Sequence, residues 1–260
     1  MRNLFSVAIA GGLMIAAATA ASAQDQADAY YPPEEMEAAR EALREGAGGQ
    51  KLFFFQADRF EYQARRDDEE LALWDVNAWY GGRVNRLWVK SEAEFELEAG
   101  AFEEANLQLL YSRAITPYFD LQAGVRQDFE PNPMRTYAVI GVQGLAPYWF
   151  EVDGAFFLSD QGELTGQFEA EYELLLTQRL ILQPRAELTW SAEDIPELET
   201  GSGLTSTALG LRLRYEILRE FAPYVGVEWS RTFGGTEDYA RAAGARTQDT
   251  AVVAGIRIWF

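Results

Sequence analysis

The chain has 260 residues, with 22 Lys and Arg against 41 Asp and Glu, a net charge of -19, and neither Cys nor His. The acidic balance argues against a nucleic acid partner, because phosphates are bound by Lys and Arg; it is typical of a secreted or envelope protein, or of one that handles cations. The lack of His excludes Ser-His-Asp and Cys-His catalysis and the commonest metal ligand, and the lack of Cys excludes disulfides and thiolate metal sites.

Residues 1–23 have the pattern of a signal peptide. Arg2 precedes an apolar run that ends near Ala18, and the small residues from Ala21 to Ala23 have the spacing that signal peptidase recognises. The run is shorter than the ~20 residues that a transmembrane helix needs. We therefore predict export and cleavage after Ala23, and any membrane span of the mature chain must consist of strands.

Residues 24–51 form the next segment. Pro32 and Pro33 precede a run rich in Glu, and glycines follow from Gly46. Pro at the start, Glu early and Gly at the end predict a short helix. It has almost no apolar face, so we expect a marginal helix in a flexible acidic periplasmic tail.

The stretch from Trp74 to Glu96 predicts a β-hairpin around Gly81 and Gly82. Side chains alternate across a strand, and here one face is apolar while the other carries Lys90 and several glutamates. A soluble sheet has this pattern when its apolar face covers a core. A membrane barrel has it when the apolar face contacts lipid and the charged face lines a lumen.

The same period continues to the end of the chain and predicts about twelve strands. Besides the two strands of the hairpin, they fall at roughly 52–63, 104–114, 118–129, 136–145, 148–159, 164–177, 180–191, 207–217, 224–231 and 250–260.

The connections between these strands differ systematically in length. Those after even-numbered strands are short, and three carry a small residue, Pro and then Tyr, ending at Tyr118, Tyr148 and Tyr224; two connections after odd-numbered strands are long, 192–206 and 232–249. Short turns at one end, long loops at the other and tyrosines near the turns indicate an outer-membrane barrel with an aromatic girdle. The last strand ends on Phe260, as bacterial outer-membrane barrels typically do. We therefore predict an all-β fold: a transmembrane, antiparallel, up-and-down β-barrel over residues 52–260, with a short flexible N-terminal tail.

The lumen of such a barrel collects the charged faces of the strands. Two strands each place three carboxylates on one face, Glu92, Glu94 and Glu96 on the first and Glu169, Glu171 and Glu173 on the second. One interpretation is a ladder of salt bridges that stiffens the wall. The other is a cation path or cation-binding surface, because carboxylate oxygens attract and bind cations. Neither pattern indicates the cleft that a glycosidase needs, so we expect no enzymatic activity. Four tryptophans expected to face inward, Trp79, Trp88, Trp149 and Trp259, are interpreted as packing rather than a plug.

Several strings resemble one family in the right order along the chain. The main one runs from Trp74 to Gly82 and continues from Asn85 to Glu92; others are 58–62, 110–114, 120–126, 144–150 and 221–229. Over about residues 58–260 the chain resembles the copper resistance protein B family, an outer-membrane component of bacterial copper-resistance systems.

The resemblance implies tolerance to excess copper by binding or expelling copper ions at the outer membrane, together with periplasmic partners such as a multicopper oxidase. Family members often carry a Met- and His-rich N-terminal segment, which suits copper. Here the mature chain has only Met36 and Met134 and no His. The candidate metal ligands are therefore the six glutamates above with Met36 and Met134.

Three functions remain open at this point. The leading hypothesis is a copper-resistance barrel whose lumen carboxylates bind copper weakly and exchangeably. The second is a general acidic diffusion pore in the outer membrane without copper specificity. The third is a structural or adhesive barrel whose long loops contact an external partner.

Overall fold

The structure, a computed structural model, describes residues 30–43, 46, 49–65 and 70–260. The chain divides into two units, Met1–Gly49 and Gln50–Phe260. In the first, helix α2 (Pro33–Leu43) has Glu34 and Glu35 in its first turn and buries none of its residues, which confirms the predicted short helix. The predicted signal peptide, 1–23, lies outside the described residues. None of the described helices has the length and apolar character needed to cross a membrane.

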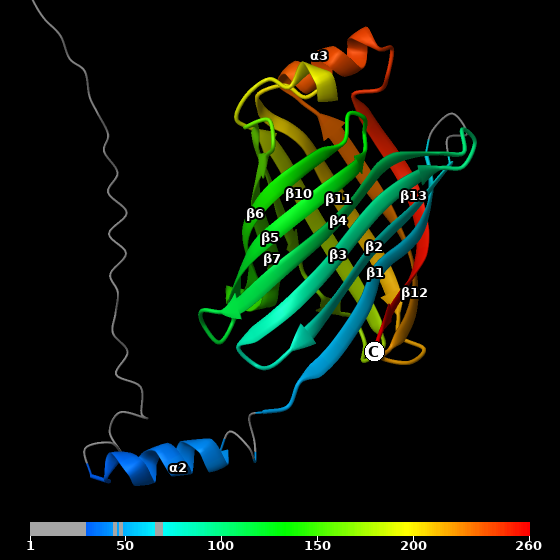
Figure 1. Ribbon diagram of the computed structural model, residues 1–260. Coiled ribbons are helices and arrows are strands. Elements are labelled where there is room, and N and C mark those ends of the chain that lie inside the picture. The colour runs from blue at the N-terminus through cyan, green and yellow to red at the C-terminus, as the bar shows by residue number, and fades with distance from the viewer. Residues whose placement is uncertain (1–29, 44–45, 47–48, 66–69) are drawn as a thin grey trace, which may run out of the picture. The chain divides into compact units, whose positions relative to one another are not determined.

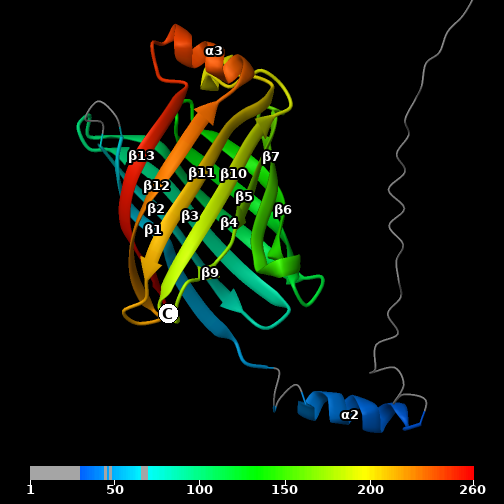
Figure 2. The ribbon, with the colours of Figure 1, turned by 180° about the vertical axis from the view of Figure 1, so that it is seen from behind.

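The second unit is a closed antiparallel β-barrel of twelve strands with one extra short strand (Figures 1 and 2). Strands pair with their neighbours in sequence, except that β8 and β9 both pair with β10, and β13 pairs with β1, for example through Tyr62 and Ala254, which closes the sheet. The strands are β1 (Leu52–Ala64), β2 (Glu70–Gly81), β3 (Asn85–Glu96), β4 (Ala101–Ala114), β5 (Phe119–Glu130), β6 (Arg135–Ala146), β7 (Phe150–Ser159), β8 (Leu164–Glu171), β9 (Leu174–Leu175), β10 (Leu180–Ser191), β11 (Gly203–Tyr215), β12 (Phe221–Thr232) and β13 (Gln248–Trp259).

The two faces of the wall have the polarity of a barrel that spans a membrane. In β4, Leu107 and Leu109 are 44% and 47% exposed, whereas Asn106 and Gln108 between and beside them are buried. The same alternation occurs in β11, where Leu211 and Leu213 point outward and Arg212 and Arg214 are buried. A soluble monomer would not expose so many large apolar side chains. The predicted fold is confirmed, with apolar residues outside and charged residues inside.

One predicted strand, 164–177, is interrupted. It ends as β8 at Glu171 and resumes as β9 at Leu174. The opposing residue is Pro184 of β10, whose carbonyl oxygen accepts a hydrogen bond from Tyr172 N at 3.1 Å. The hydrogen-bonding groups of Pro184 therefore point toward this strand, but proline has no N–H to return the second bond of the pair. The missing donor breaks the ladder at Tyr172 and Glu173.

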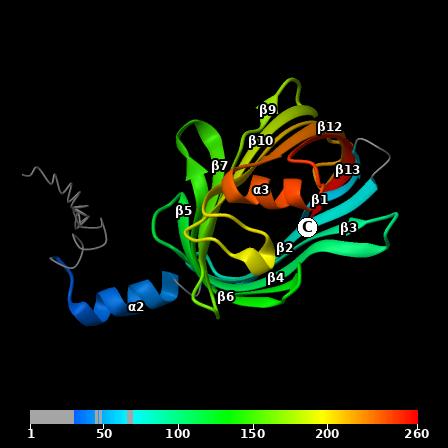
Figure 3. The ribbon, with the colours of Figure 1, turned by 90° about the horizontal axis from the view of Figure 1, so that it is seen from above.

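The two ends of the barrel differ as predicted (Figure 1), and Figure 3 looks onto the end that carries the long connections. At one end lie the short turns, including 3-10 helix η3 (Pro147–Trp149). At the other lie the long connections, which carry 3-10 helix η4 (Pro196–Leu198) and helix α3 (Gly234–Ala242). These two connections contact each other, because Gly201 N donates to Thr236 Oγ1 at 2.9 Å. We call them the turn end and the loop end.

The aromatic residues near the turn end correct two expectations. Tyr118 and Tyr148 are exposed, as a girdle requires, but Tyr224 is only 6% exposed. Strand β12 begins at Phe221, before the predicted turn, so Tyr224 faces inward and lies over Gly255, where a Cβ atom would be 2.5 Å from Tyr224 Oη. Trp149 is not an inward residue: it has a φ of 69° in the η3 turn and is 70% exposed.

Candidate functional site

The lumen contains two large cavities, one toward each end. The loop-end cavity, about 380 Å³, is lined by Thr200, Thr205 and Asp249 near the long connections, and carries seven Asp or Glu side chains against three Arg. The turn-end cavity, about 470 Å³, reaches Pro117 and Tyr118 of the β4–β5 turn, and carries eight Asp or Glu against one Arg and one Lys. Both cavities therefore have an excess of negative charge.

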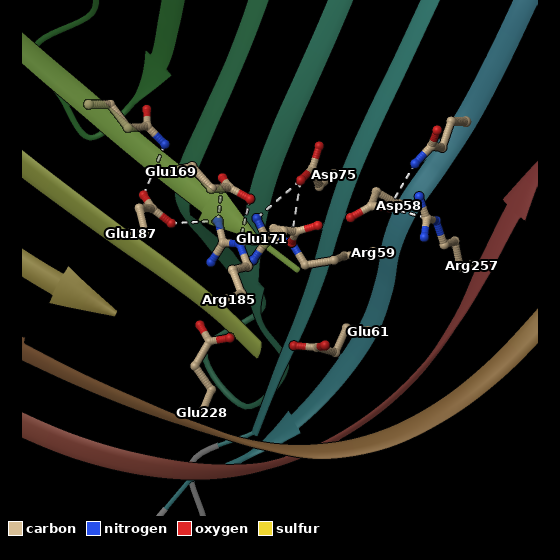
Figure 4. A network of polar contacts seen from close by, with 12 residues as sticks. Asp58, Arg59, Glu61, Asp75, Glu169, Glu171, Arg185, Glu187, Glu228 and Arg257 are labelled. Carbon is tan, nitrogen blue, oxygen red and sulfur yellow. Dashed lines mark hydrogen bonds and ion pairs between the residues drawn. The ribbon is translucent and has the colours of Figure 1, made fainter. Parts of the chain in front are cut away.

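Arginines neutralise part of this charge in compact clusters, and Arg185 of β10 has three carboxylate partners (Figure 4). Its guanidinium binds both oxygens of Glu169 at 2.7 and 2.8 Å and Glu187 at 2.6 Å, and its Nε atom lies 3.5 Å from Glu171. The side chain of Arg185 is 2% exposed. Carboxylates on the adjacent strand and on β10 itself thus surround one buried cation, which offsets the cost of removing each charge from water.

Two further clusters connect strands that are not neighbours. Arg212 of β11 binds Glu61 of β1 through two hydrogen bonds, at 2.8 and 3.0 Å, and Glu228 at 2.6 Å. Glu173, in the break between β8 and β9, accepts hydrogen bonds from Arg214 and Arg257, both at 2.6 Å. Arg257 lies on β13, so this contact crosses the interior rather than following the wall.

Between the two large cavities is a waist. Lys90 Nζ on β3 lies 2.5 Å from Asp153 Oδ2 on β7, an ion pair that also crosses the interior. A small cavity of about 40 Å³, which we call the waist cavity, lies beside this pair and includes Glu92. Glu92 lines all three cavities. Apolar side chains narrow the same region, in a cluster formed by Trp88, Leu110, Tyr137, Val139 and Phe157.

The six glutamates predicted as ligands all belong to the barrel wall, five of them within strands and Glu173 in the break between β8 and β9, but their surroundings differ. Glu169, Glu171 and Glu173 are bound by arginines as described, and Glu94 lies 3.3 Å from Arg65. Glu96, at the loop end of β3, lines neither large cavity. Only Glu92 combines a position between the cavities with a side chain that forms no ion pair or hydrogen bond with any residue that the structure describes.

The three members of each set do not converge. Residues two apart on a strand are about 6.6 Å apart along its axis. Over the described part of the chain, no three Asp, Glu, His or Cys side chains form a group that could hold a metal ion by themselves. Of the two methionines, Met36 lies in α2, and Met134 is 60% exposed in the connection between β5 and β6. Met134 lines neither of the two large cavities, and Met36 belongs to the other unit of the chain.

Sequence analysis missed the residues around Glu92 that complete the waist. Lys90 and Asp153 have the inward position that alternation predicts, but their pairing depends on how the barrel closes. Gln108 and Gln122 both line the waist cavity. Gln122 lies within the family-like string 120–126, whereas the only signal for Gln108 in the sequence is its place among inward-facing residues.

Comparison with known proteins identifies the family. The family model described as copper resistance protein B precursor (CopB) matches residues 51–260, which is the whole barrel. The chain belongs to this family. Copper resistance protein B of Escherichia coli is 47% identical over 203 residues, which cover 78% of this chain and 68% of the relative. The copper resistance protein B homolog of Pseudomonas syringae pv. tomato is 44% identical over 207 residues, 80% and 69% of the two chains.

A solved structure supports the fold independently. The NanC porin has a TM-score of 0.50 to this CopB-family chain at 8% identity, with 80% of this chain and 99% of the porin covered. At that identity the similarity concerns the fold alone. The barrel fold is therefore that of outer-membrane proteins, and family membership supports a role in copper resistance.

Proposed function

We propose that this protein contributes to copper resistance as a non-enzymatic outer-membrane barrel whose acidic lumen binds copper(II) weakly and passes it along the barrel axis. The observation that carries the proposal is the excess of carboxylates over cationic groups in both large cavities. A cavity lined by one sign of charge, within walls of low dielectric constant, raises the local concentration of the opposite ion. The lumen is thus suited to collecting cations from either end.

The ligand chemistry favours exchange over storage. The cavities offer carboxylate and amide oxygens, and the mature chain contains no His or Cys and only two Met. Soft thiolate and thioether ligands select copper(I), and imidazole binds copper(II) tightly. Oxygen ligands alone hold copper(II) loosely, and an ion that crosses a lumen must be bound weakly enough to leave.

Orientation and partner complete the proposal. The turn end would face the periplasm and the loop end the exterior, as short and long connections do in outer-membrane barrels. A multicopper oxidase in the periplasm would then meet the turn-end cavity. The predicted division into signal peptide (1–23), tail (24–51) and barrel (52–260) is part of the same proposal.

Copper tolerance tests the proposal in cells. In a strain without redundant copper exporters, deletion of the gene should lower the copper concentration that permits growth, and the gene on a plasmid should restore it. Zinc and cobalt tolerance serve as controls and should not change. Unaltered copper sensitivity after deletion would count against the proposal.

Conductance in a planar bilayer separates this function from a general acidic pore. We expect added copper(II) to reduce the potassium current, because the bound ion occupies the lumen. Calcium at the same concentration and charge provides the control for simple screening. A potassium current that copper(II) and calcium affect equally would favour the general pore.

A further inference from the structure

The waist cavity has the size and lining of an ion site. Its volume of about 40 Å³ exceeds the roughly 10–15 Å³ that one water molecule requires. Three carboxylates line it, Glu92, Asp153 and Glu169, and so do the amides of Gln108, Gln122 and Gln167. The only cationic side chain in its lining is Lys90. The polar lining thus consists of oxygen-bearing groups and a single ammonium.

Several of these oxygens accept no hydrogen bond from any residue that the structure describes. Gln108 is 6% exposed and forms no side-chain hydrogen bond with any residue that the structure describes. Gln122 and Gln167 donate their Nε2 groups to Gln143 and Glu187, both at 2.9 Å, so their amide carbonyl oxygens remain available as acceptors. The waist cavity therefore holds acceptors that a ligand would satisfy.

Charge around the waist cavity is also unbalanced. Glu169 is held by both of its oxygens on Arg185, and Asp153 is bound to Lys90. Glu92 forms no close ion pair with a described residue; its interaction with Arg126 is electrostatic and without direct contact. The oxygens of one waist carboxylate are thus free of direct partners among the described residues and available to an additional cation.

Lys90 differs from the other lumen cations in how it is held. Each arginine cluster fixes a planar guanidinium through several hydrogen bonds, whereas the Lys90 ammonium makes a single ion pair and lies 5.8 Å from the centre of the Trp88 ring. A lysine is a point charge on a flexible stem. It can leave Asp153 without breaking a bidentate contact.

From this geometry we propose that the waist cavity is a binding site for one divalent cation, held by oxygen ligands and part of its own water shell, and that the Lys90 ammonium is the tethered cation it displaces. The entering ion replaces the ammonium at Asp153 and gains Glu92 and the Gln108 carbonyl oxygen. The carboxylates stand around the cavity without converging on one point, as suits an ion that keeps some of its waters. The site passes one ion at a time between the two large cavities.

The proposal deepens the proposed function and rests on it for the identity of the ion as copper(II). The ligand set itself requires only a divalent cation with a preference for oxygen, such as Mn²⁺. Copper(I) is excluded from the site because no sulfur or imidazole lines the waist cavity. Titrations with Cu²⁺ and with Mn²⁺ therefore test two questions separately: whether the waist cavity binds a divalent cation, and whether that cation is copper(II).

Electron paramagnetic resonance of the purified mature protein in detergent micelles measures binding and ligand type together. We expect one bound Cu²⁺ with an all-oxygen spectrum. Glu92→Gln should weaken binding by at least about tenfold, because it removes the one waist carboxylate whose oxygens contact no described side chain. Lys90→Gln should tighten binding by roughly tenfold, because the competing ammonium is gone. The second result is the decisive one, since a purely structural ion pair would give no gain of affinity when it is removed.

Glu96→Gln is the matched control. Glu96 lies on the same strand as Glu92 and forms no ion pair with any described residue, but it lines neither the waist cavity nor the two large cavities. Its substitution removes the same charge and should change the affinity by less than about twofold. Lys90→Arg, which keeps the charge, should bind no more tightly than the wild type. The folded fraction of every variant is checked by its resistance to unfolding in SDS before heating.

The outcomes distinguish the two levels of the proposal. If Mn²⁺ shows this order of affinities and Cu²⁺ does not bind, the site stands and copper(II) as cargo falls. If neither ion binds more tightly to Lys90→Gln than to the wild type, the site is overturned, whereas the deletion phenotype still decides the role in copper resistance.

Discussion

Lys90 Nζ and Asp153 Oδ2 lie 2.5 Å apart and join β3 to β7 through the interior of the barrel. The two residues are 63 positions apart in the chain. Strands β4, β5 and β6 separate their strands in the sheet, so the contact bridges the lumen instead of running along the wall. The ion pair lies between the loop-end cavity and the turn-end cavity, at the level of the apolar cluster that includes Trp88.

Removing this link should widen the lumen. We expect Lys90→Ala to raise the single-channel potassium conductance by at least about twofold, because the narrowest part of a pore limits its current. Arg86→Ala is the matched control: Arg86 pairs with Asp120 at 3.0 Å in the turn-end cavity and leaves the waist intact. Equal conductance in the wild type and Lys90→Ala would show that the pair does not control the path.

Arg185 should dominate the stability of the lumen. Arg185→Met keeps the length of the side chain but leaves Glu169 and Glu187 without their buried counterion. Loss of one partner from a buried ion pair costs about 3–5 kcal/mol. The free energy of unfolding, measured by urea titration in micelles, should fall by that amount. For Arg86→Met, whose pair is more exposed, the loss should be about 1 kcal/mol or less, and equal losses for both variants would refute the cluster's importance.

Arg135 connects two loops at the loop end of the barrel. Its guanidinium contacts Glu163 in the β7–β8 turn at 3.3 Å and also hydrogen-bonds Glu197 in η4. Arg135→Gln should release the β10–β11 connection and speed protease cleavage near Glu197 by roughly tenfold, since cleavage tracks local opening. Arg241→Gln, within the exposed ion pairs of α3, should leave that rate unchanged. A cleavage rate that does not respond to Arg135→Gln would show that Arg135 does not hold the β10–β11 connection in place.

Pro184 explains the break between β8 and β9 and gives a direct test. Pro184→Ala supplies the missing N–H opposite Tyr172, so the ladder can continue through Glu173. We expect the backbone amide that this substitution introduces to be protected from hydrogen exchange to the same degree as that of Arg185. If the introduced amide exchanges as fast as those in the turns, proline is not the cause of the break.

The sequence predicted the barrel well because period-two alternation is local. The alternation within each strand predicts which of its residues face inward and which face outward. The lengths of the connections predict which strand ends lie together at each end of the barrel. The predictions were wrong where a residue on an adjacent strand determines the local structure. Pro184 lies inside a strand that was predicted correctly, yet it interrupts the strand beside it. Tyr224 followed the same Pro-Tyr motif as Tyr118, but β12 starts early enough to turn it inward over Gly255.

The site was less predictable for the same reason. Alternation placed Glu92 and Glu169 in the lumen, but it could not show that Arg185 binds Glu169 directly while the Glu92 side chain forms no close ion pair with any described residue. Contacts across the lumen, such as that of Lys90 with Asp153, depend on strand tilt and register around the whole barrel. No pattern within one strand contains that information.

The central claim is that the apolar face of the wall contacts lipid and the acidic face encloses water. The chain contains no cysteine, so single cysteines report on each face without background. Val142 is 38% exposed on the outer face, and its neighbour Gln143 lines the turn-end cavity. In lipid vesicles, a cationic thiol reagent should modify Gln143→Cys, and about tenfold faster than an anionic reagent of the same size, because the lumen is acidic. Val142→Cys should react only with a lipid-soluble reagent; charged reagents that modify Val142→Cys but not Gln143→Cys would contradict the account.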